Sequence, residues 1–327
     1  MKGIAQETEI FCGFQLSAMR LPSAPTFREA MMTRRIFKIF ALLWASIVVA
    51  SCGFEAAATD PIPAHDTVNV ASETLNEKRV INIYLPDGYS DTEQVYPVVY
   101  MPDGGIEEDF PHIANTLAEM IKSGKIEEVI LVGIENTDRR RDLTPSSTTA
   151  YDRDYGPSGD GATAFRTFIR DELIPMVESK YRTGKGRTII GESAAGLFVI
   201  DTFFREPTLF DNYIAMDPAL WWDDHRLVKQ APRRLAASDL SGKTLWFAGS
   251  SAKDIQPHTR MLEKAFRAAE PSGLRWTYRD SPKEKHTTIF RATKESAFEW
   301  SLGNSLNTSD DTESRRTPPL SSATSKE

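Results

Sequence analysis

The chain has 327 residues, of which 40% are hydrophobic and 26% are charged, as in an ordinary soluble globular protein with a sizeable core. Its formal net charge of −7 provides no basic face, so the composition excludes nucleic acid and an anionic surface as partners. The two cysteines, Cys12 and Cys52, lie outside the region that we predict to fold, which excludes a disulfide framework and a cysteine-rich metal site.

An export signal is predicted near the N-terminus. Arg34, Arg35 and Lys38 precede an apolar run over residues 39–50, and small residues follow this run. This order is typical of a cleavable secretory signal. The apolar run has 12 residues, whereas a helix that spans a bilayer needs about 20.

The cysteine at position 52 gives the signal a more specific interpretation. Residues 49–52, Val-Ala-Ser-Cys, resemble the lipobox of bacterial lipoproteins, in which the cysteine is lipidated and becomes the first residue. The alternative is ordinary cleavage after the alanines at 56–58, which leaves a free periplasmic or secreted protein. Residues 33–38 also resemble a twin-arginine signal. We therefore predict an exported bacterial protein that contacts a membrane only through a lipid on Cys52.

Three regions are predicted along the chain. Residues 1–58 contain the signal and a short linker. Because the signal begins at one of two consecutive methionines, we expect residues 1–30 to be a mis-assigned N-terminus. Residues 59–303 are predicted to form one folded domain. Residues 304–327 are rich in Ser, Thr, Pro and charge, so we expect a disordered polar tail.

Short β-rich runs alternate with helical patterns from about residue 67 onward, which predicts an α/β fold with a mostly parallel sheet and helices on both faces. The predicted strands are residues 67–72, 79–85, 97–101, 129–134, 188–191, 212–216, 244–248 and 274–278. The predicted helices are residues 110–123, 162–181, 194–204, 258–269 and 290–302. Residues 135–160 form a long polar loop, and a loop of that length in a compact domain is usually functional.

Ser193 is the candidate nucleophile. It lies in Gly191-Glu192-Ser193-Ala194-Ala195-Gly196, at a predicted sharp turn between a strand and a helix. Such a G-x-S-x-G turn needs small neighbours because the helix passes close to the strand, and it raises the hydroxyl above the sheet. Ala195 replaces the last glycine of the pattern, and Gly196 relieves part of the crowding. The alternative interpretation is that Ser193 only caps the following helix.

A serine hydroxyl needs a base, and in this kind of fold the base follows the serine and an acid in chain order. Three histidines follow Ser193, namely His225, His258 and His286. His286 comes after the last predicted strand and just before the final helix, where the fold delivers its base. His225 and His258 are interpreted as surface or capping residues.

Two carboxylates are candidates for the acid that orients the imidazole, because each follows a predicted strand. Asp254 comes shortly after strand 244–248, the usual place, and is our choice. Asp217, at the end of strand 212–216, is the competitor, although its neighbour Pro218 suggests a rigid turn instead.

Two backbone amides are needed to stabilise the oxyanion that forms when an ester carbonyl is attacked. One should come from Ala194, the residue after the nucleophile. The other should come from Met101-Pro102-Asp103-Gly104-Gly105, where a strand ends in two glycines. Gly105 is our choice, with Gly104 nearly equivalent, and a plain turn is the alternative.

These motifs together resemble the "Putative esterase" family, which includes esterase D and the enterochelin and salmochelin trilactone esterases. The resemblance extends from about Val80 to Leu302. It rests on residues 100–105, on residues 132–136 with Arg-Asp-Leu-Thr-Pro at 141–145, on Gly191-Glu192-Ser193, on Asp-Pro-Ala-Leu-Trp-Trp at 217–222, and on His286. It implies the α/β-hydrolase fold and carboxylic-ester hydrolysis.

The resemblance also implies roles for two further residues. Arg141 would lie near an acidic or polar group of the substrate, and Trp221 would line an acyl or aromatic pocket. Three positions depart from the common family pattern, since Glu192 stands where a histidine is frequent, Ala195 where glycine is, and Ala219 where serine is.

The sequence thus predicts an exported serine esterase that needs no metal or organic cofactor and acts on a small-molecule ester, such as a siderophore trilactone. The first alternative is an acyltransferase of the same fold, which would need an acceptor groove that outcompetes water. The second is a non-catalytic lipoprotein of the same fold that binds a ligand in the cell envelope.

Overall fold

The computed structural model describes residues 60–156 and 159–303. The predicted export signal, Cys52 and the polar tail at 304–327 lie outside the described residues. The described residues belong to the compact unit that begins at Asp60.

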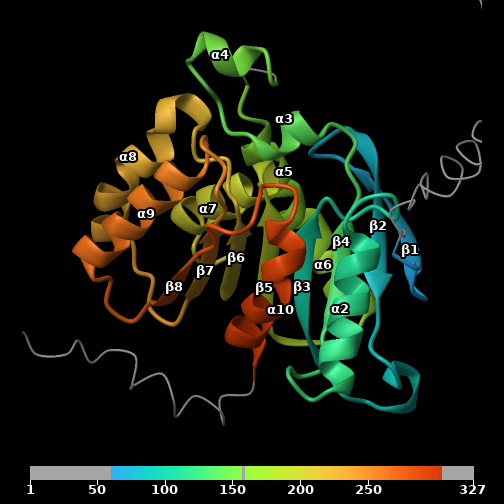
Figure 1. Ribbon diagram of the computed structural model, residues 1–327. Helices are drawn as coiled ribbons and strands as arrows, with labels where there is room; N and C mark the ends of the chain where they lie inside the picture. Colours follow the sequence, from blue (N-terminus) through green and yellow to red (C-terminus); the bar gives the residue numbers. More distant parts are fainter. Residues whose placement is uncertain (1–59, 157–158, 304–327) are drawn as a thin grey trace, which may run out of the picture. The chain divides into compact units, whose positions relative to one another are not determined.

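One eight-stranded sheet forms the centre of the described domain (Figure 1). Its strand order is β1-β2-β4-β3-β5-β6-β7-β8. The pairings β1–β2 and β2–β4 are antiparallel, and all the other pairings are parallel. The strands are β1 (Asp66–Ser72), β2 (Glu77–Tyr84), β3 (Tyr96–Pro102), β4 (Ile130–Ile134), β5 (Thr183–Glu192), β6 (Asn212–Met216), β7 (Thr244–Gly249) and β8 (Arg275–Asp280).

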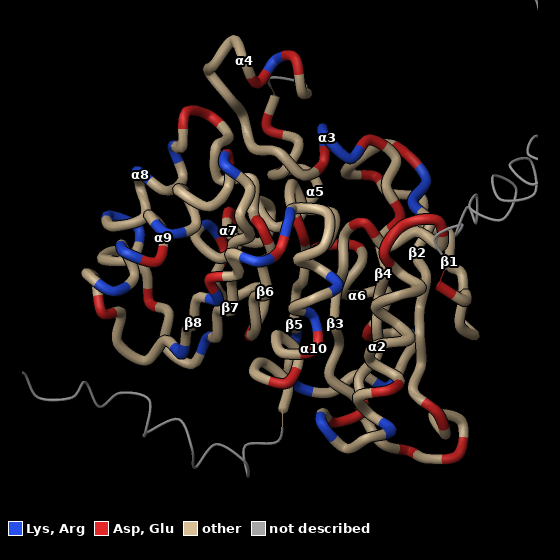
Figure 2. Tube along the Cα trace, in the orientation of Figure 1, with Lys and Arg blue, Asp and Glu red and all other residues tan. Residues whose placement is uncertain are grey.

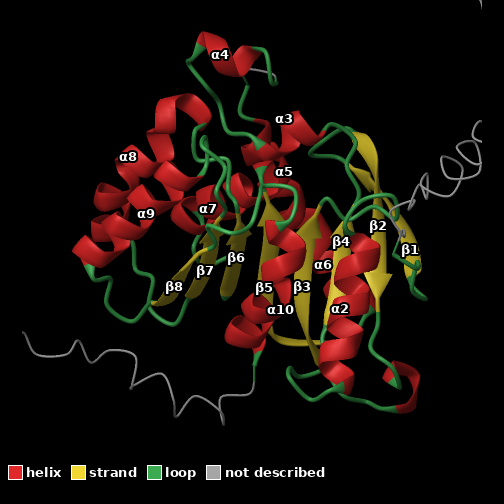
Figure 3. Cartoon of the chain, in the orientation of Figure 1, coloured by secondary structure: helices red, strands yellow, loops and turns green. Residues whose placement is uncertain are grey.

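Helices connect the parallel strands and cover both faces of the sheet (Figure 3). Helices α2 and α10 lie on one face, and helices α7, α8 and α9 lie on the other. The helices are α2 (Phe110–Lys122), α3 (Arg139–Leu143), α4 (Ala150–Arg153), α5 (Gly161–Phe168), α6 (Ile174–Lys180), α7 (Ala194–Arg205), α8 (Trp222–Ala237), α9 (Gln256–Ala269) and α10 (Ile289–Leu302), with a 3-10 turn at Tyr89–Asp91 and a π turn at Ile169–Leu173. This is the α/β-hydrolase fold, as the sequence predicted.

The core divides into two layers because side chains of a strand point alternately to opposite faces. In β3, Val98 and Tyr100 join the larger cluster under α5 to α9. Val99 and Met101 join the smaller cluster under α2 and α10. All four side chains are at most 2% exposed, so this central strand is buried on both faces, as expected for a parallel sheet.

The helices predicted from the sequence do not include α8. Its apolar residues Leu227, Val228, Ala231 and Leu235 are buried and have helical spacing. However, Asp223, Asp224 and His225 at its start adopt left-handed backbone angles, and Pro232 lies within it. Because each of these features normally signals a turn, the local sequence pattern does not predict a helix here.

The carboxyl ends of the parallel strands meet at one edge of the sheet, which is the usual place for a ligand in this class of fold. Short helices α3 and α4 stand beyond this edge in the segment that was predicted as a long loop (Figure 1). Acidic and basic positions alternate over the whole described domain, with no face of one sign (Figure 2). No helix in residues 60–156 or 159–303 combines the length and the apolar character that crossing a bilayer requires.

Candidate active site

Ser193 occupies a strained turn between β5 and α7. Its backbone angles are φ 60° and ψ −117°, a combination that residues with a side chain rarely adopt. A Cβ atom at Gly191 would come within 2.7 Å of the Ala195 side chain and 2.6 Å of its carbonyl carbon, so only glycine fits there. The methyl group of Ala195 is therefore accommodated because position 191 has no side chain. The turn places the hydroxyl at the sheet edge instead of within the helix.

His286 extends from the loop between β8 and α10 to the serine. Its Nε2 atom lies 3.1 Å from Ser193 Oγ, so the hydroxyl can donate its proton to the ring. Its Nδ1 atom lies 2.9 Å from Asp217 Oδ2, which is the contact of a donated N–H. Ser193 and His286, which are 93 positions apart in the chain, are thus brought within hydrogen-bond distance, as the sequence predicted.

The carboxylate that contacts the ring of His286 is that of Asp217, whereas Asp254 was expected there from the sequence. Asp217 follows β6 and is fully buried, and its carboxylate accepts hydrogen bonds from the backbone N–H of Ser250 (2.5 Å) and the hydroxyl of Ser250 (2.6 Å). Ser250 stands just after β7, the strand whose end was expected to supply the acid. Instead of an acid, the end of β7 supplies the hydrogen-bond donor that holds Asp217 in place. Asp254 lies in the turn before α9, on the wall of the adjacent cavity, and makes no hydrogen bond with His286.

The hydrogen bond to Asp217 raises the pKa of His286 above its ordinary value, and this effect exceeds the opposing effect of burial. The negative charges of Glu192, Asp217 and Asp254 raise this pKa further. The ring is therefore a stronger base than a free histidine, as proton abstraction from a hydroxyl requires. Sequence analysis did not anticipate the contribution of Glu192, which lies directly before the nucleophile.

The predicted oxyanion donors are only partly available. Ala194 is the first residue of α7, and amides of the first helical turn have no acceptor within their own helix. The amide of Gly104 donates to the carbonyl of Ile134 (3.0 Å). The amide of Gly105 donates to Oε2 of Glu108 (2.7 Å). Gly105 is thus not an open donor in this structure, and the carboxylate of Glu108 would have to move for it to bind an oxyanion.

A cavity of about 540 Å³ adjoins the serine. Trp221 lines it, as predicted. Its ring packs against those of Tyr151 (centroids 5.9 Å apart) and Tyr155 (5.1 Å), which lie in the segment around α4, residues 145–156, called the α4 segment below. Arg139 and Arg140 also line the cavity. These two tyrosines and two arginines were not singled out from the sequence, because the polar loop that carries them has no periodic pattern.

The α4 segment is fastened to the start of α8. The buried carboxylate of Asp223 accepts from the backbone N–H of Thr148 (2.8 Å) and from its hydroxyl (3.0 Å). In return, the backbone N–H of Asp223 donates to Asp152 (2.7 Å), and the indole of Trp222 donates to the carbonyl of Pro145 (2.9 Å). These bonds hold the two tyrosines of the α4 segment over the cavity.

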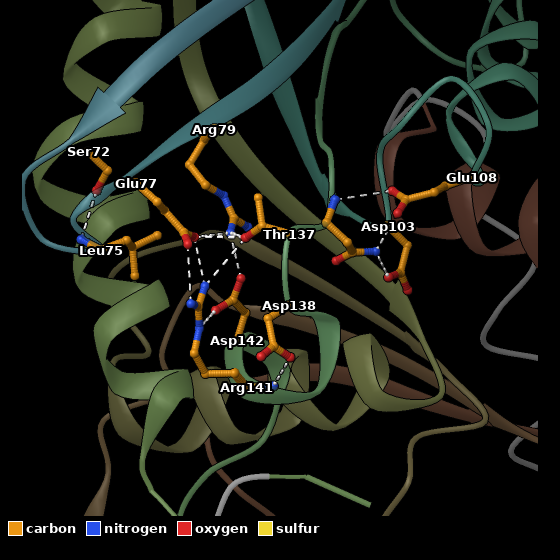
Figure 4. Close-up of polar contacts among 11 residues, drawn as sticks. Ser72, Leu75, Glu77, Arg79, Asp103, Glu108, Thr137, Asp138, Arg141 and Asp142 are labelled. Atoms are coloured by element: carbon orange, nitrogen blue, oxygen red, sulfur yellow. Dashed lines mark hydrogen bonds and ion pairs between the residues drawn. The ribbon is translucent and has the colours of Figure 1, made fainter.

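Arg141 does not lie at the cavity, which contradicts the role that the resemblance implied for it. Its guanidinium donates to Asp142 Oδ1 (2.7 Å) and Glu77 Oε1 (2.7 Å), beside the fully buried Arg79 (Figure 4). The two preceding arginines, Arg139 and Arg140, reach the cavity instead, because a helix directs consecutive side chains to different sides. Arg139 is itself held by both oxygens of Asp103, at 2.6 and 2.8 Å.

No group of three or more His, Cys, Asp or Glu side chains in residues 60–156 and 159–303 is arranged to hold a metal ion. The arrangement that is present, a hydroxyl, an imidazole and a carboxylate joined in series, is suited to acyl transfer.

Comparison with known proteins agrees with this chemistry. Residues 72–297 match the family described as "Putative esterase". The chain belongs to this family. It is therefore an esterase with an α/β-hydrolase fold, in agreement with the resemblance noted from its motifs.

Individual relatives differ in how much of the chain they share. The ferri-bacillibactin esterase BesA of Bacillus subtilis is 25% identical over 255 residues, which cover 69% of this chain and 86% of that protein. The uncharacterised protein YjcH of the same organism is 30% identical over 165 residues, 49% of this chain and 64% of YjcH. The crystal structure of an IroE-like serine hydrolase from Shewanella oneidensis aligns with a TM-score of 0.68 and 28% identity, over 72% of this chain and 79% of that one.

Proposed function

We propose that the protein is a serine carboxylic-ester hydrolase in which Ser193 is the nucleophile, His286 the base and Asp217 the acid. The observation that carries this proposal is the continuous series of contacts from the Ser193 hydroxyl to His286 Nε2 and from Nδ1 to the buried Asp217. The strained backbone at Ser193 supports it, because such strain persists mainly at functional sites. Helix capping does not require a histidine and a carboxylate in series.

The reaction follows from this geometry. His286 takes the proton of Ser193 as the oxygen attacks the ester carbonyl, and Asp217 stabilises the imidazolium that results. The Ala194 amide receives the oxyanion, with Gly105 as the second donor once Glu108 has released it. His286 then protonates the departing alcohol, and water repeats the cycle to release the acid.

We expect Ser193→Ala to abolish labelling by a fluorophosphonate probe, because the nucleophile is gone. The same change should lower the turnover of a nitrophenyl ester by about a thousandfold or more. His286→Ala keeps the hydroxyl but not its base, so labelling should be much slower than in the wild type while thermal unfolding is little changed. Equal labelling of wild type and Ser193→Ala would place the nucleophile elsewhere. Absence of labelling and turnover in the wild type would favour a binding protein.

The choice between the two carboxylates is tested by Asp217→Asn and Asp254→Asn. Asp217→Asn should lower kcat about a thousand- to ten-thousandfold, because the imidazole loses the partner that fixes its tautomer. Asp254→Asn removes only a charge on the cavity wall and should lower kcat less than about tenfold. Steady-state kinetics with one nitrophenyl ester separates the two, and the reverse ranking would return the acid role to Asp254.

For the substrate, we propose an ester with aromatic or anionic groups, of the siderophore type. Four Tyr and Trp side chains and two arginines line the cavity beside Ser193. The guanidinium of Arg140 lies 5.8 Å from the ring centre of Tyr155, and none of the carboxylates in the described residues forms an ion pair with it. The names of relatives point the same way, since one is a ferri-bacillibactin esterase and another, from Emericella nidulans, a siderophore enterobactin esterase that is 35% identical over 128 residues.

A panel of ferric and iron-free siderophore trilactones, with simple alkyl esters of the same chain length for comparison, tests the substrate class. We expect kcat/KM for trilactones to exceed that for alkyl esters by at least about a hundredfold, because remote contacts with the aromatic and cationic wall contribute to transition-state binding. Trp221→Ala should reduce this preference and leave alkyl-ester turnover nearly constant. A preference for alkyl esters in the wild type would contradict the proposed class.

Export remains a prediction from the sequence, and we propose that the enzyme acts in the cell envelope, anchored through Cys52. Mass spectrometry of protein isolated from a bacterial host should give a mature chain that begins at Cys52 and carries a diacylglyceryl group. A mature chain that begins after residues 56–58 without lipid would support the free periplasmic form, and an uncleaved chain would contradict export.

A further inference from the structure

Glu192, at the end of β5, provides a second carboxylate beside the imidazole of His286. Its Oε1 atom lies 3.6 Å from Nδ1, the same ring nitrogen that contacts Asp217 at 2.9 Å. The side chain of Glu192 is 18% exposed. Two carboxylates therefore face one N–H, and the mechanism above uses only the first of them.

The two carboxylates differ in how they are held. Asp217 accepts two hydrogen bonds from Ser250 in addition to that from His286. Within residues 60–156 and 159–303, no donor lies within hydrogen-bond distance of the carboxylate of Glu192, although its backbone carbonyl accepts from Arg139 (3.5 Å). A largely buried carboxylate that accepts no hydrogen bond is poorly stabilised in its charged form, so Glu192 is free to gain and lose a proton while Asp217 is fixed.

The charged groups around Glu192 come from four parts of the fold, namely His286 after β8, Asp217 after β6, Asp109 before α2 and Arg139 in α3. Burial raises the pKa of Glu192 to about 7, and the negative charges of Asp109 and Asp217 act in the same direction. The positive charges of His286 and Arg139 act against this rise but do not cancel it.

We propose that Glu192 is a positioning residue of the esterase reaction, whose negative charge, when present, stabilises the imidazolium form of His286 and thereby increases turnover above neutral pH. The inference rests on the proposed function. The charge favours the transition state over the ground state because His286 is neutral before proton transfer and positive during it.

The sign of the pH effect follows from the two protonation states. Below neutral pH, Glu192 is protonated and contributes no charge, so a glutamine at this position should behave as the wild type does. Above neutral pH, the wild type gains the charge and Glu192→Gln does not. The same charge raises the pKa of His286. This effect on His286 is therefore also confined to pH values at which Glu192 is ionised.

The kinetic test compares pH profiles of wild type, Glu192→Gln and Glu93→Gln, the last being a matched change at an exposed glutamate in the loop before β3. We expect Glu192→Gln to match the wild type near pH 5.5, to fall about tenfold below it on the alkaline plateau of kcat, and to keep its KM within about twofold. Glu93→Gln should follow the wild type throughout. Superimposable profiles for all three proteins, or a pH-independent loss in Glu192→Gln, would overturn the inference.

Thermal unfolding gives a second measurement that does not depend on turnover. Because the pKa of Glu192 is higher in the folded chain than in the unfolded chain, the folded state retains a proton that the unfolded state releases as pH rises from about 4.5 to about 7. Ionisation of Glu192 thus destabilises the wild type above neutral pH, and Glu192→Gln avoids this loss. We expect the Tm of the variant relative to the wild type to rise by several degrees between pH 5 and pH 8.

The two measurements separate failure of the inference from failure of the proposed function. Full turnover in Ser193→Ala would reject the proposed nucleophile, whereas it would leave the Tm difference of Glu192→Gln unaffected. A Tm difference that is constant with pH would show that Glu192 does not titrate near neutrality, and would overturn the inference even if Ser193 is the nucleophile.

Discussion

The close approach of helix α7 to strand β5 is the constraint on which the candidate site depends. Gly191 leaves no room for a side chain against Ala195, and the chain must therefore reverse through the strained conformation of Ser193. This turn presents the serine hydroxyl to His286 and leaves the Ala194 amide free of an intrahelical acceptor. The position of the Ser193 hydroxyl, its contact with His286 and the orientation of the Ala194 amide are thus linked to one packing contact between a helix and a strand.

The carboxylates around the imidazole show how burial and hydrogen bonding divide similar groups into different roles. Asp217 is fully buried and fixed by Ser250, so it stays in place as the hydrogen-bond acceptor for Nδ1. Within the described residues the carboxylate of Glu192 accepts no such hydrogen bond, and burial raises its pKa to about 7. Asp254 acts on His286 only through its charge from the cavity wall. Several carboxylates around one histidine are typical of sites in which that histidine becomes positively charged for a short time.

The cavity depends on a segment that has little regular structure of its own. Several hydrogen bonds between this segment and the start of α8 hold Tyr151 and Tyr155 opposite Trp221. The left-handed backbone at Asp223 directs that residue's N–H and carboxylate to the segment. Tyr151 and Tyr155 thus reach the cavity from a loop beyond the sheet edge, as is common where a rigid scaffold carries variable loops.

The sequence by itself determined the fold class and singled out Ser193 and His286 as candidates, because these rest on local patterns: alternating strand and helix periods, small residues around a turn, and the order of residues after strands. Only the tertiary structure decided that Asp217 contacts the imidazole, that Arg139 and Arg140 reach the cavity in place of Arg141, and that Glu108 binds the amide of Gly105. Those outcomes depend on the direction of each side chain and on which strand ends are neighbours in space, and neither is encoded in spacing along the chain.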